Sequence, residues 1–266
     1  MSFLSPIRRT WAHRALVAAL VRRELTARYR GGALGFLWSF LNPLLLLLVY
    51  ATVFRLVFAP RADVRPYALF LFGGVLVWGF VSAALTDAVD TFRVNGPLLR
   101  KTTVSPEVFP AAAVGARLAH LVLALPVLAA AIVFETVRGG VRPSAAVLEF
   151  PAVLALLCLA VFGAALGLSA LAVHFGDVRD IVSNLLTLTF FVTPVLYPVE
   201  AVPARWRWLL RANPFAGFFA GLHDTLFFFR PVAAADWLSM AVTAALALVL
   251  GGALFERLRD SLAEEA

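Results

Sequence analysis

The chain has 266 residues, of which 62% are hydrophobic and only 15% are charged, and its formal net charge is +7. Soluble domains usually carry about a quarter charged residues, so this composition indicates one membrane domain and leaves little chain for a soluble one. Nucleic-acid binding would explain the positive net charge, but the positions of the arginines favour a signal for membrane topology. The single cysteine, Cys158, lies in an apolar run, and no intramolecular disulfide is possible.

The amino-terminal stretch from about Thr10 to Arg30 has the pattern of an amphipathic helix. Its apolar face carries Leu16, Val17, Leu20 and Val21, and its polar face carries Arg22, Arg23, Thr26 and Arg30. We expect this helix to lie in the inner membrane interface, with arginines toward anionic headgroups. The alternative is a soluble helix that packs against a partner protein. The predicted interface residues are Arg22, Arg23, Arg28, Tyr29 and Arg30.

Six later segments have the length and apolar character of membrane-spanning helices, which need about 20 residues. They are residues 36–58, 67–89, 108–134, 147–173, 181–199 and 237–255. The apolar stretch Phe215–Phe229 is too short to span, so we expect region 200–236 to form external re-entrant helices. The sequence thus predicts an all-α membrane protein. It has a cytoplasmic amphipathic segment (1–35), a six-helix transmembrane domain (36–255) and a cytoplasmic tail (256–266).

The arginines predict the orientation of these segments. Seven arginines precede the first span, against a single acid, Glu24. Arg93, Arg100 and the only lysine, Lys101, lie between the second and third spans. The positive-inside rule places both regions in the cytoplasm. Six crossings then put the carboxyl terminus there as well.

Two predicted spans carry aromatic faces with a few hydroxyl groups. In the first span, the residues within a narrow stripe are Phe36, Phe40, Pro43, Leu47, Tyr50, Phe54 and Phe58; in the fifth they are Ser183, Thr187, Phe190, Pro194 and Tyr197. Such faces suit sugars, which offer C–H surfaces for stacking and hydroxyls for hydrogen bonds. They predict a translocation path. The alternative is that these residues face lipid or pack against other helices.

The loop between the second and third spans, Asp90 to Phe109, has the pattern of a docking element. It predicts a turn at Asn95 and Gly96, then a short helix that Pro97 opens and that presents Leu98, Leu99, Arg100 and Lys101. Ser105, Pro106 and Glu107 are typical of the start of the third span. A membrane-edge loop without a partner is the alternative.

Charged residues at membrane depth are functional candidates. Asp87 and Asp90 end the second span, and Arg117 and His120 lie in the third, which predicts an ion pair between these helix ends. The sequence contains no Gly-x-x-x-x-Gly-Lys-Ser/Thr phosphate loop. Its four histidines are scattered, and no spacing suggests a metal site or an activated nucleophile. We expect no catalytic residue, no metal and no cofactor in this chain.

Several motifs resemble the ABC-2 type permeases for polysaccharide export, which include the O-antigen (Wzm-like) and teichoic acid exporters. The matching segments are Arg22–Arg30, Leu34–Trp38, Leu41–Leu44, Leu98–Lys101, Ser105–Pro110, Thr193–Pro198 and Asn213–Phe215. The resemblance runs in order over nearly the whole chain.

The resemblance implies a multi-pass protein of the bacterial inner membrane that exports a lipid-linked polysaccharide. It implies two copies of this chain and two copies of a separate cytoplasmic ATPase, which binds ATP and Mg²⁺. The segment Asn95–Lys101 would couple the ATPase to the channel, and the two aromatic faces would line it. The open alternatives are an ABC-2 exporter of drugs or small lipids, a membrane enzyme acting on lipid phosphates, and a passive channel.

Overall fold

The computed structural model describes residues 5–29, 35–56, 67–101, 104–139, 142–259 and 261–262. Within these ranges all the regular structure is helical, which confirms the all-α prediction. The long helices are α2 (Arg14–Tyr29), α3 (Trp38–Leu56), α4 (Tyr67–Lys101), α5 (Val108–Val137), α6 (Phe150–His174), α7 (Val178–Val192) and α10 (Ala234–Leu258). Short helices are α1 (Ser5–Ala12), α8 (Arg207–Ala212) and α9 (Ala216–Leu226), with 3₁₀ turns at 35–37, 145–149, 199–201 and 204–206.

Four helical segments are long and apolar enough to cross a bilayer: 67–99, 108–137, 145–174 and 234–258. They correspond to the second, third, fourth and sixth predicted spans. The first predicted span is the 19-residue helix α3, whose apolar stretch is Trp38–Val53. The fifth is shorter than expected, because α7 ends at Val192 and residues 193–198 form a turn around Pro194. The proline ring disfavours helical backbone at the residue before it, and Thr193 before Pro194 is extended. A single helix over 181–199 was therefore a wrong prediction.

The central helices pack through small residues. Gly163 and Gly167 of α6 face Gly251 of α10, and Gly167 lies close enough that an added Cβ would meet Gly251 Cα at 3.1 Å. A Cβ at Gly163 would overlap the backbone of Ala247 and Leu248. Small residues let two helix backbones approach closely, and in a membrane such packing supplies much of the association energy.

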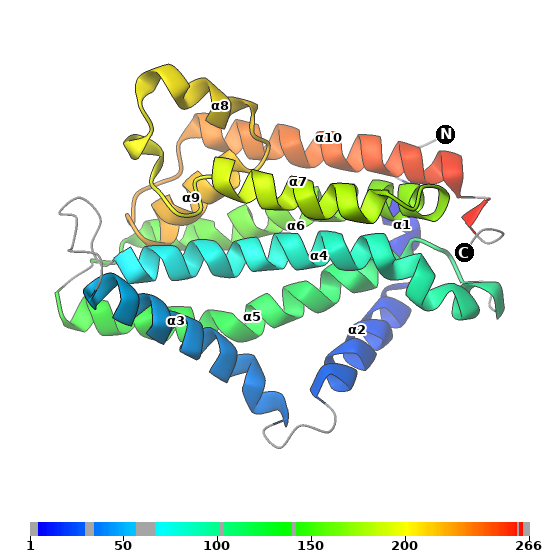
Figure 1. Cartoon of the computed structure of the whole chain (residues 1–266), viewed down its shortest axis with the longest axis horizontal. Coiled ribbons are helices and arrows are strands. Elements are labelled where there is room, and N and C mark those ends of the chain that lie inside the picture. The colour runs from blue at the N-terminus through cyan, green and yellow to red at the C-terminus, as the bar shows by residue number, and fades with distance from the viewer. Residues whose placement is uncertain are drawn as a thin grey trace.

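Helix α4 lies in the middle of the bundle, with α3 on one flank and α7 on the other (Figure 1). It packs against α5, α6 and α9 through a core that includes Val81, Leu121, Leu157 and Phe219. Figure 1 also shows that α1, the end of α4 and the end of α10 lie at the same end of the molecule. We call this the α1/α10 end; the opposite end carries α8 and α9.

Helix α2 packs against α5, and its apolar face is used by the chain itself. Leu20 is buried, and Leu16, Val17 and Val21 pack against the same cluster, which includes Phe109 and Phe255. Gly115 of α5 allows this approach, because a Cβ there would meet Val21 at 3.0 Å. This face therefore packs against the chain's own helices, and the location of α2 in the membrane interface stays a prediction.

The α6–α10 contact predicts a large effect of one methyl group. Gly163→Ala places a Cβ into the backbone of α10, and overpacking of this kind costs about 1–3 kcal/mol. For a chain of this length we expect the thermal midpoint in detergent to fall by roughly 2–10 °C. Gly79→Ala in α4 is the matched control, since a Cβ there meets nothing within 4 Å. An equal loss of stability in both variants would contradict the packing account.

Candidate functional site

The flank formed by α3 presents mainly aliphatic side chains. Leu44, Leu45, Leu48 and Val49 are exposed, whereas Pro43 is buried. The predicted aromatic stripe lies elsewhere on the helix: Phe40 is half-buried, and Tyr50 packs against a cluster of Leu69, Phe72 and Leu128. The side chains of Phe36 and Phe54, and the whole of Phe58, lie outside the described residues. Channel lining by this stripe stays a prediction.

The flank formed by α7 separates the residues that the sequence grouped on one face. Ser183 and Thr187 are exposed, and the Thr187 hydroxyl donates to the Ser183 carbonyl at 3.0 Å. Phe190 points to α4, with its ring 5.7 Å from that of Trp78. Tyr197 lies beyond the helix, and its hydroxyl donates back to the carbonyls of Phe191 and Val192. The open surface of α7 therefore combines two hydroxyl side chains with exposed aliphatic ones, including Leu185 and Leu188.

The predicted coupling element is the end of one long helix. Helix α4 runs unbroken from Tyr67 through Pro97 to Lys101, so the predicted turn at Asn95 and Gly96 was wrong. Asn95 donates to the Thr91 carbonyl at 2.9 Å and accepts from Arg23 of α2 at 3.0 Å. These bonds satisfy the amide inside the helix, where an asparagine otherwise favours turns.

The exposed surface of this helix end also differs from the prediction. Leu99 is buried and Leu98 is partly buried, both against the cluster around Phe109 and Phe255, so they do not form an exposed apolar pair. Instead, Val94 is 69% exposed, and Arg93 and Pro97 are exposed beside it. The side chains of Arg100 and Lys101 lie outside the described residues. We call Arg93, Val94 and Pro97 the α4 tip.

Ion pairs join the α4 tip to its neighbours. Asp90 lies 3.2 Å from Arg93 and 3.4 Å from Arg179, which begins α7. One turn earlier, Asp87 pairs with Arg117 of α5, whose Nε and Nη2 both donate to the carboxylate, the latter at 2.8 Å. The predicted ion pair between the second and third spans is thus confirmed. It spares an arginine at membrane depth the cost of an unpaired charge.

A buried carboxylate fixes the α1/α10 end. Glu107 precedes α5, and its side chain is fully buried, where it pairs with Arg9 of α1 and lies 3.6 Å from Arg259 after α10. Arg9 also pairs with Glu256 of α10. The sequence suggested only that Glu107 opens a helix, because the partners lie about 100 residues or more away. Removing one member would leave a buried charge unpaired, which is strongly destabilising.

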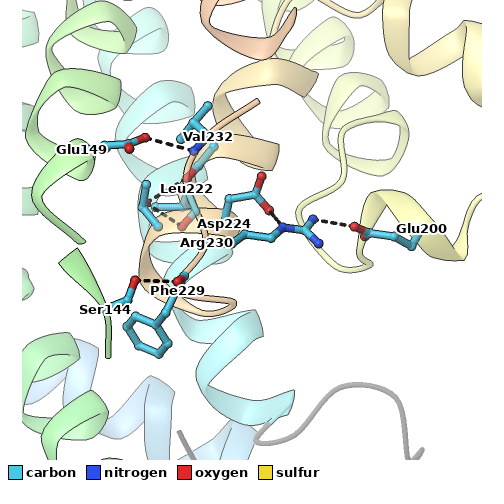
Figure 2. A network of polar contacts seen from close by, with 10 residues as sticks. Ser144, Glu149, Glu200, Leu222, Asp224, Phe229, Arg230 and Val232 are labelled. Carbon is cyan, nitrogen blue, oxygen red and sulfur yellow. Dashed lines mark hydrogen bonds and ion pairs between the residues drawn. The ribbon is translucent and has the colours of Figure 1, made fainter. Parts of the chain in front are cut away.

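At the opposite end, polar contacts fasten the loop between α9 and α10 (Figure 2). Arg230 donates from Nε to Asp224 at 2.7 Å and from Nη2 to Glu200 at 2.5 Å. The Ser144 hydroxyl donates to the Phe229 carbonyl at 2.6 Å, and the Val232 amide donates to Glu149 at 3.0 Å. Figure 2 shows Arg230 reaching from this loop toward the segment that follows α7.

The contribution of this network to the stability of the fold depends on pH. Burial alone would raise the pKa of Glu200, but the hydrogen bond and charge of Arg230 outweigh burial and lower it. Because the pKa of Glu200 is lower in the folded chain than in the unfolded chain, the Glu200–Arg230 pair stabilises the fold at pH values above the ordinary carboxyl pKa. The contribution is lost as the pH falls through the lowered pKa. Because both side chains are about half exposed, solvent screens the pair and its contribution is small.

Helix α9 is buried although it contains two ionisable residues. His223 stacks on Phe70 of α4, with ring centroids 3.7 Å apart, and Asp224 is held by Arg230. Within the described residues, His, Cys, Asp and Glu form no group that would hold a metal ion. The described residues offer exposed surfaces on α3 and α7, an exposed α4 tip and polar contacts that hold both ends of the bundle together.

Sequence comparisons relate this chain to known transport proteins. A sequence profile of the family described as "ABC-2 type transporter" matches residues 15–227. The O-antigen export system permease protein RfbA of Myxococcus xanthus is 33% identical over 260 residues, which cover 97% of this chain and 98% of that protein. Two proteins of the same name from Klebsiella pneumoniae are 29% and 28% identical, each over 94% of both chains.

The network in Figure 2 predicts that Arg230 controls the order of the α9–α10 loop. Arg230→Met leaves the Asp224 carboxylate, whose side chain is only 8% exposed, without its charged partner. Loss of such a bond costs about 1–3 kcal/mol, so the backbone amides of residues 227–230 and 232 should exchange hydrogen roughly 5- to 150-fold faster. Arg211→Met, at an exposed position of α8, is the control. Unchanged exchange in Arg230→Met would show that the network does not fasten the loop.

Proposed function

This chain belongs to the ABC-2 type transporter family, and we propose that it forms the channel of an ATP-driven exporter of lipid-linked polysaccharide such as O-antigen. Members of the family are the membrane subunits of transporters rather than enzymes, and the family implies an ABC ATPase as partner. The observation that carries the proposal is the match to O-antigen export permeases over 97% of this chain. A match of that extent leaves only about 3% of the chain outside it.

We propose six crossings of the bacterial inner membrane, with both termini in the cytoplasm. Four described helices have the required length, and α3 and α7 would supply the other two. Residues 193–198, which continue from α7, would complete the fifth crossing. The α1/α10 end then faces the cytoplasm, in line with the arginines that precede α3. Helices α8 and α9 would form the re-entrant region at the outer face, where burial of α9 supports helical backbone that does not cross.

The two flanks of α4 support a channel made by two copies. Within one chain α3 and α7 lie on opposite sides of α4 (Figure 1). They would meet only if α3 of one copy faced α7 of another. In that arrangement the hydroxyls of Ser183 and Thr187 would face the glycan. We keep Phe36, Phe40, Tyr50, Phe54, Phe58, Phe190 and Tyr197 as further channel candidates, and note that Tyr50, Phe190 and Tyr197 already have contacts within the chain.

The α4 tip is the proposed docking surface for the ATPase. An exposed valine flanked by Arg93 and Pro97 offers an apolar anchor at the cytoplasmic end of a long, rigid helix. ATP and Mg²⁺ would bind only to the two partner ATPases. A displacement of the α4 tip would be transmitted to α7 through the Asp90–Arg179 ion pair and to α2 through the Asn95–Arg23 hydrogen bond.

The function is tested in a bacterium that lacks its own O-antigen export permease. Co-expression of this chain with its ATPase should restore O-antigen at the cell surface. Val94→Glu introduces a charge into the proposed contact, so it should reduce both export and co-purification of the ATPase at least tenfold. Val137→Glu, at an 83% exposed valine on the outer end of α5, is the control.

Two results would contradict the proposal. Export that stays absent while the ATPase still binds would exclude O-antigen and favour a smaller substrate, such as a drug or lipid. ATP hydrolysis by this chain purified alone would contradict the assignment of hydrolysis to a separate ATPase subunit.

A further inference from the structure

Hydrogen bonds hold helix α8 beside the end of α7. Asn213, which follows α8, donates from Nδ2 to the Thr193 hydroxyl at 2.8 Å, and both side chains are buried. The Phe215 amide donates to Asn213 Oδ1 at 2.9 Å. Arg207 of α8 donates from Nε to the Val202 carbonyl at 3.0 Å. Because Thr193 directly follows α7, these bonds place the end of α8 at the end of the α7 flank.

The end of α8 lies at the depth of the membrane. The ring of Phe215 is 5.8 Å from the ring of Trp78 in α4. No charged residue occurs in α4 from Tyr67 to Thr86, a run about 30 Å long, which matches the hydrocarbon core of a bilayer. Trp78 lies about 16 Å along this run from Tyr67. Figure 1 shows α8 level with the first part of α4 along the bundle, not beyond it.

At this depth Arg211 is exposed and has no charged partner. Among the described residues no acid pairs with it, whereas the carboxylates of Glu200 and Asp224 both bind Arg230. A charge at membrane depth is expensive in lipid, so such residues face a water-filled cavity or a partner. Backbone that enters the membrane without crossing it is likewise tolerated only against protein or water. The exposed side of α8 therefore faces water rather than acyl chains.

The same side of α8 presents indole rings. Trp206 is 47% exposed and Trp208 is 58% exposed. Residues two apart on a helix point in roughly opposite directions, so the burial of Leu210 turns Trp208 outward. We call Trp206, Trp208 and Arg211 the α8 surface. An indole offers a flat apolar face for the C–H surface of a sugar ring, and a guanidinium offers five donors for hydroxyl or carboxylate oxygens.

We propose that the α8 surface binds sugar units of the exported glycan in the outer half of the path, with Trp208 stacking on a ring and Arg211 donating to its oxygens. This inference rests on the proposed function. Because Asn213 ties α8 to Thr193, the α8 surface continues the open surface of α7 toward the outer face. Each contact is weak by itself, so successive sugar units can exchange at the α8 surface while the polymer moves outward.

Photo-crosslinking tests which molecule the α8 surface contacts. The full chain and its ATPase are expressed in a bacterium that makes O-antigen but lacks its own export permease. Benzoylphenylalanine replaces Trp208 or, as the control, exposed Val242 of α10. Illumination should attach O-antigen to position 208 at least fivefold more than to position 242, and blocking O-antigen synthesis should abolish the product. Equal attachment at both positions, or attachment of position 208 to phospholipid alone, would overturn the proposal.

Arg211→Met tests the arginine in the same bacterium. At equal amounts in the membrane and equal co-purification of the ATPase, it should slow the appearance of O-antigen at the cell surface at least fivefold. Arg138→Met, at an exposed arginine that follows α5, is the matched control and should export at the wild-type rate. Equal export by Arg211→Met and an exporting wild type would overturn the α8 site alone. A wild type that exports no O-antigen would overturn the proposed function, and this site with it.

Discussion

The architecture depends on one helix that is longer than the membrane is thick. Helix α4 has 35 residues and is about 52 Å long, whereas the hydrocarbon core of a bilayer measures about 30 Å. The excess has to lie outside the hydrocarbon, where its polar side chains are solvated. Because α3, α5, α6, α7 and α9 all contact α4, a movement of its tip would act on each of these helices. Asp87 and Asp90 provide that connection through Arg117 and Arg179.

Apolar length was the property that the sequence encoded most directly. Four predicted spans correspond to the four long apolar helices, because the cost of exposing backbone to lipid leaves a helix as the only solution. The Asp87–Arg117 pair was also predictable, since two opposite charges at similar membrane depth have a strong reason to meet. The packing partner of the apolar face of α2 was not predictable. That face contacts α5, because the protein core and lipid acyl chains can both cover the same apolar side chains.

The wrong turn at Asn95 and Gly96 and the missed polar contacts share one cause, which is that long-range contacts overrule local preference. Asn95 and Gly96 are typical turn residues, yet the bond from Arg23 and the burial of Leu99 keep that segment helical. The fastening of the α9–α10 loop involves Ser144 and Glu149, about 80 residues before their partners, and no local pattern marks such pairs. The four-charge cluster around Glu107 was missed for the same reason. Channel lining by the aromatic stripe of α3 stays a prediction, because periodicity does not distinguish a channel face from a packing face.

In the proposed exporter one chain supplies half of the pathway, and its α3 flank faces the α7 flank of a second copy. Leu45 and Leu185 are exposed on these helices, each seven residues from the start of its helix. In a Cys158→Ala background, a chain with Leu45→Cys and a differently tagged chain with Leu185→Cys are co-expressed and mildly oxidised in membranes. A disulfide-linked heterodimer carrying both tags is the expected product. Its absence, or equal cross-linking when the second cysteine is at exposed Leu246 of α10 instead, would contradict the pairing of the α3 and α7 flanks.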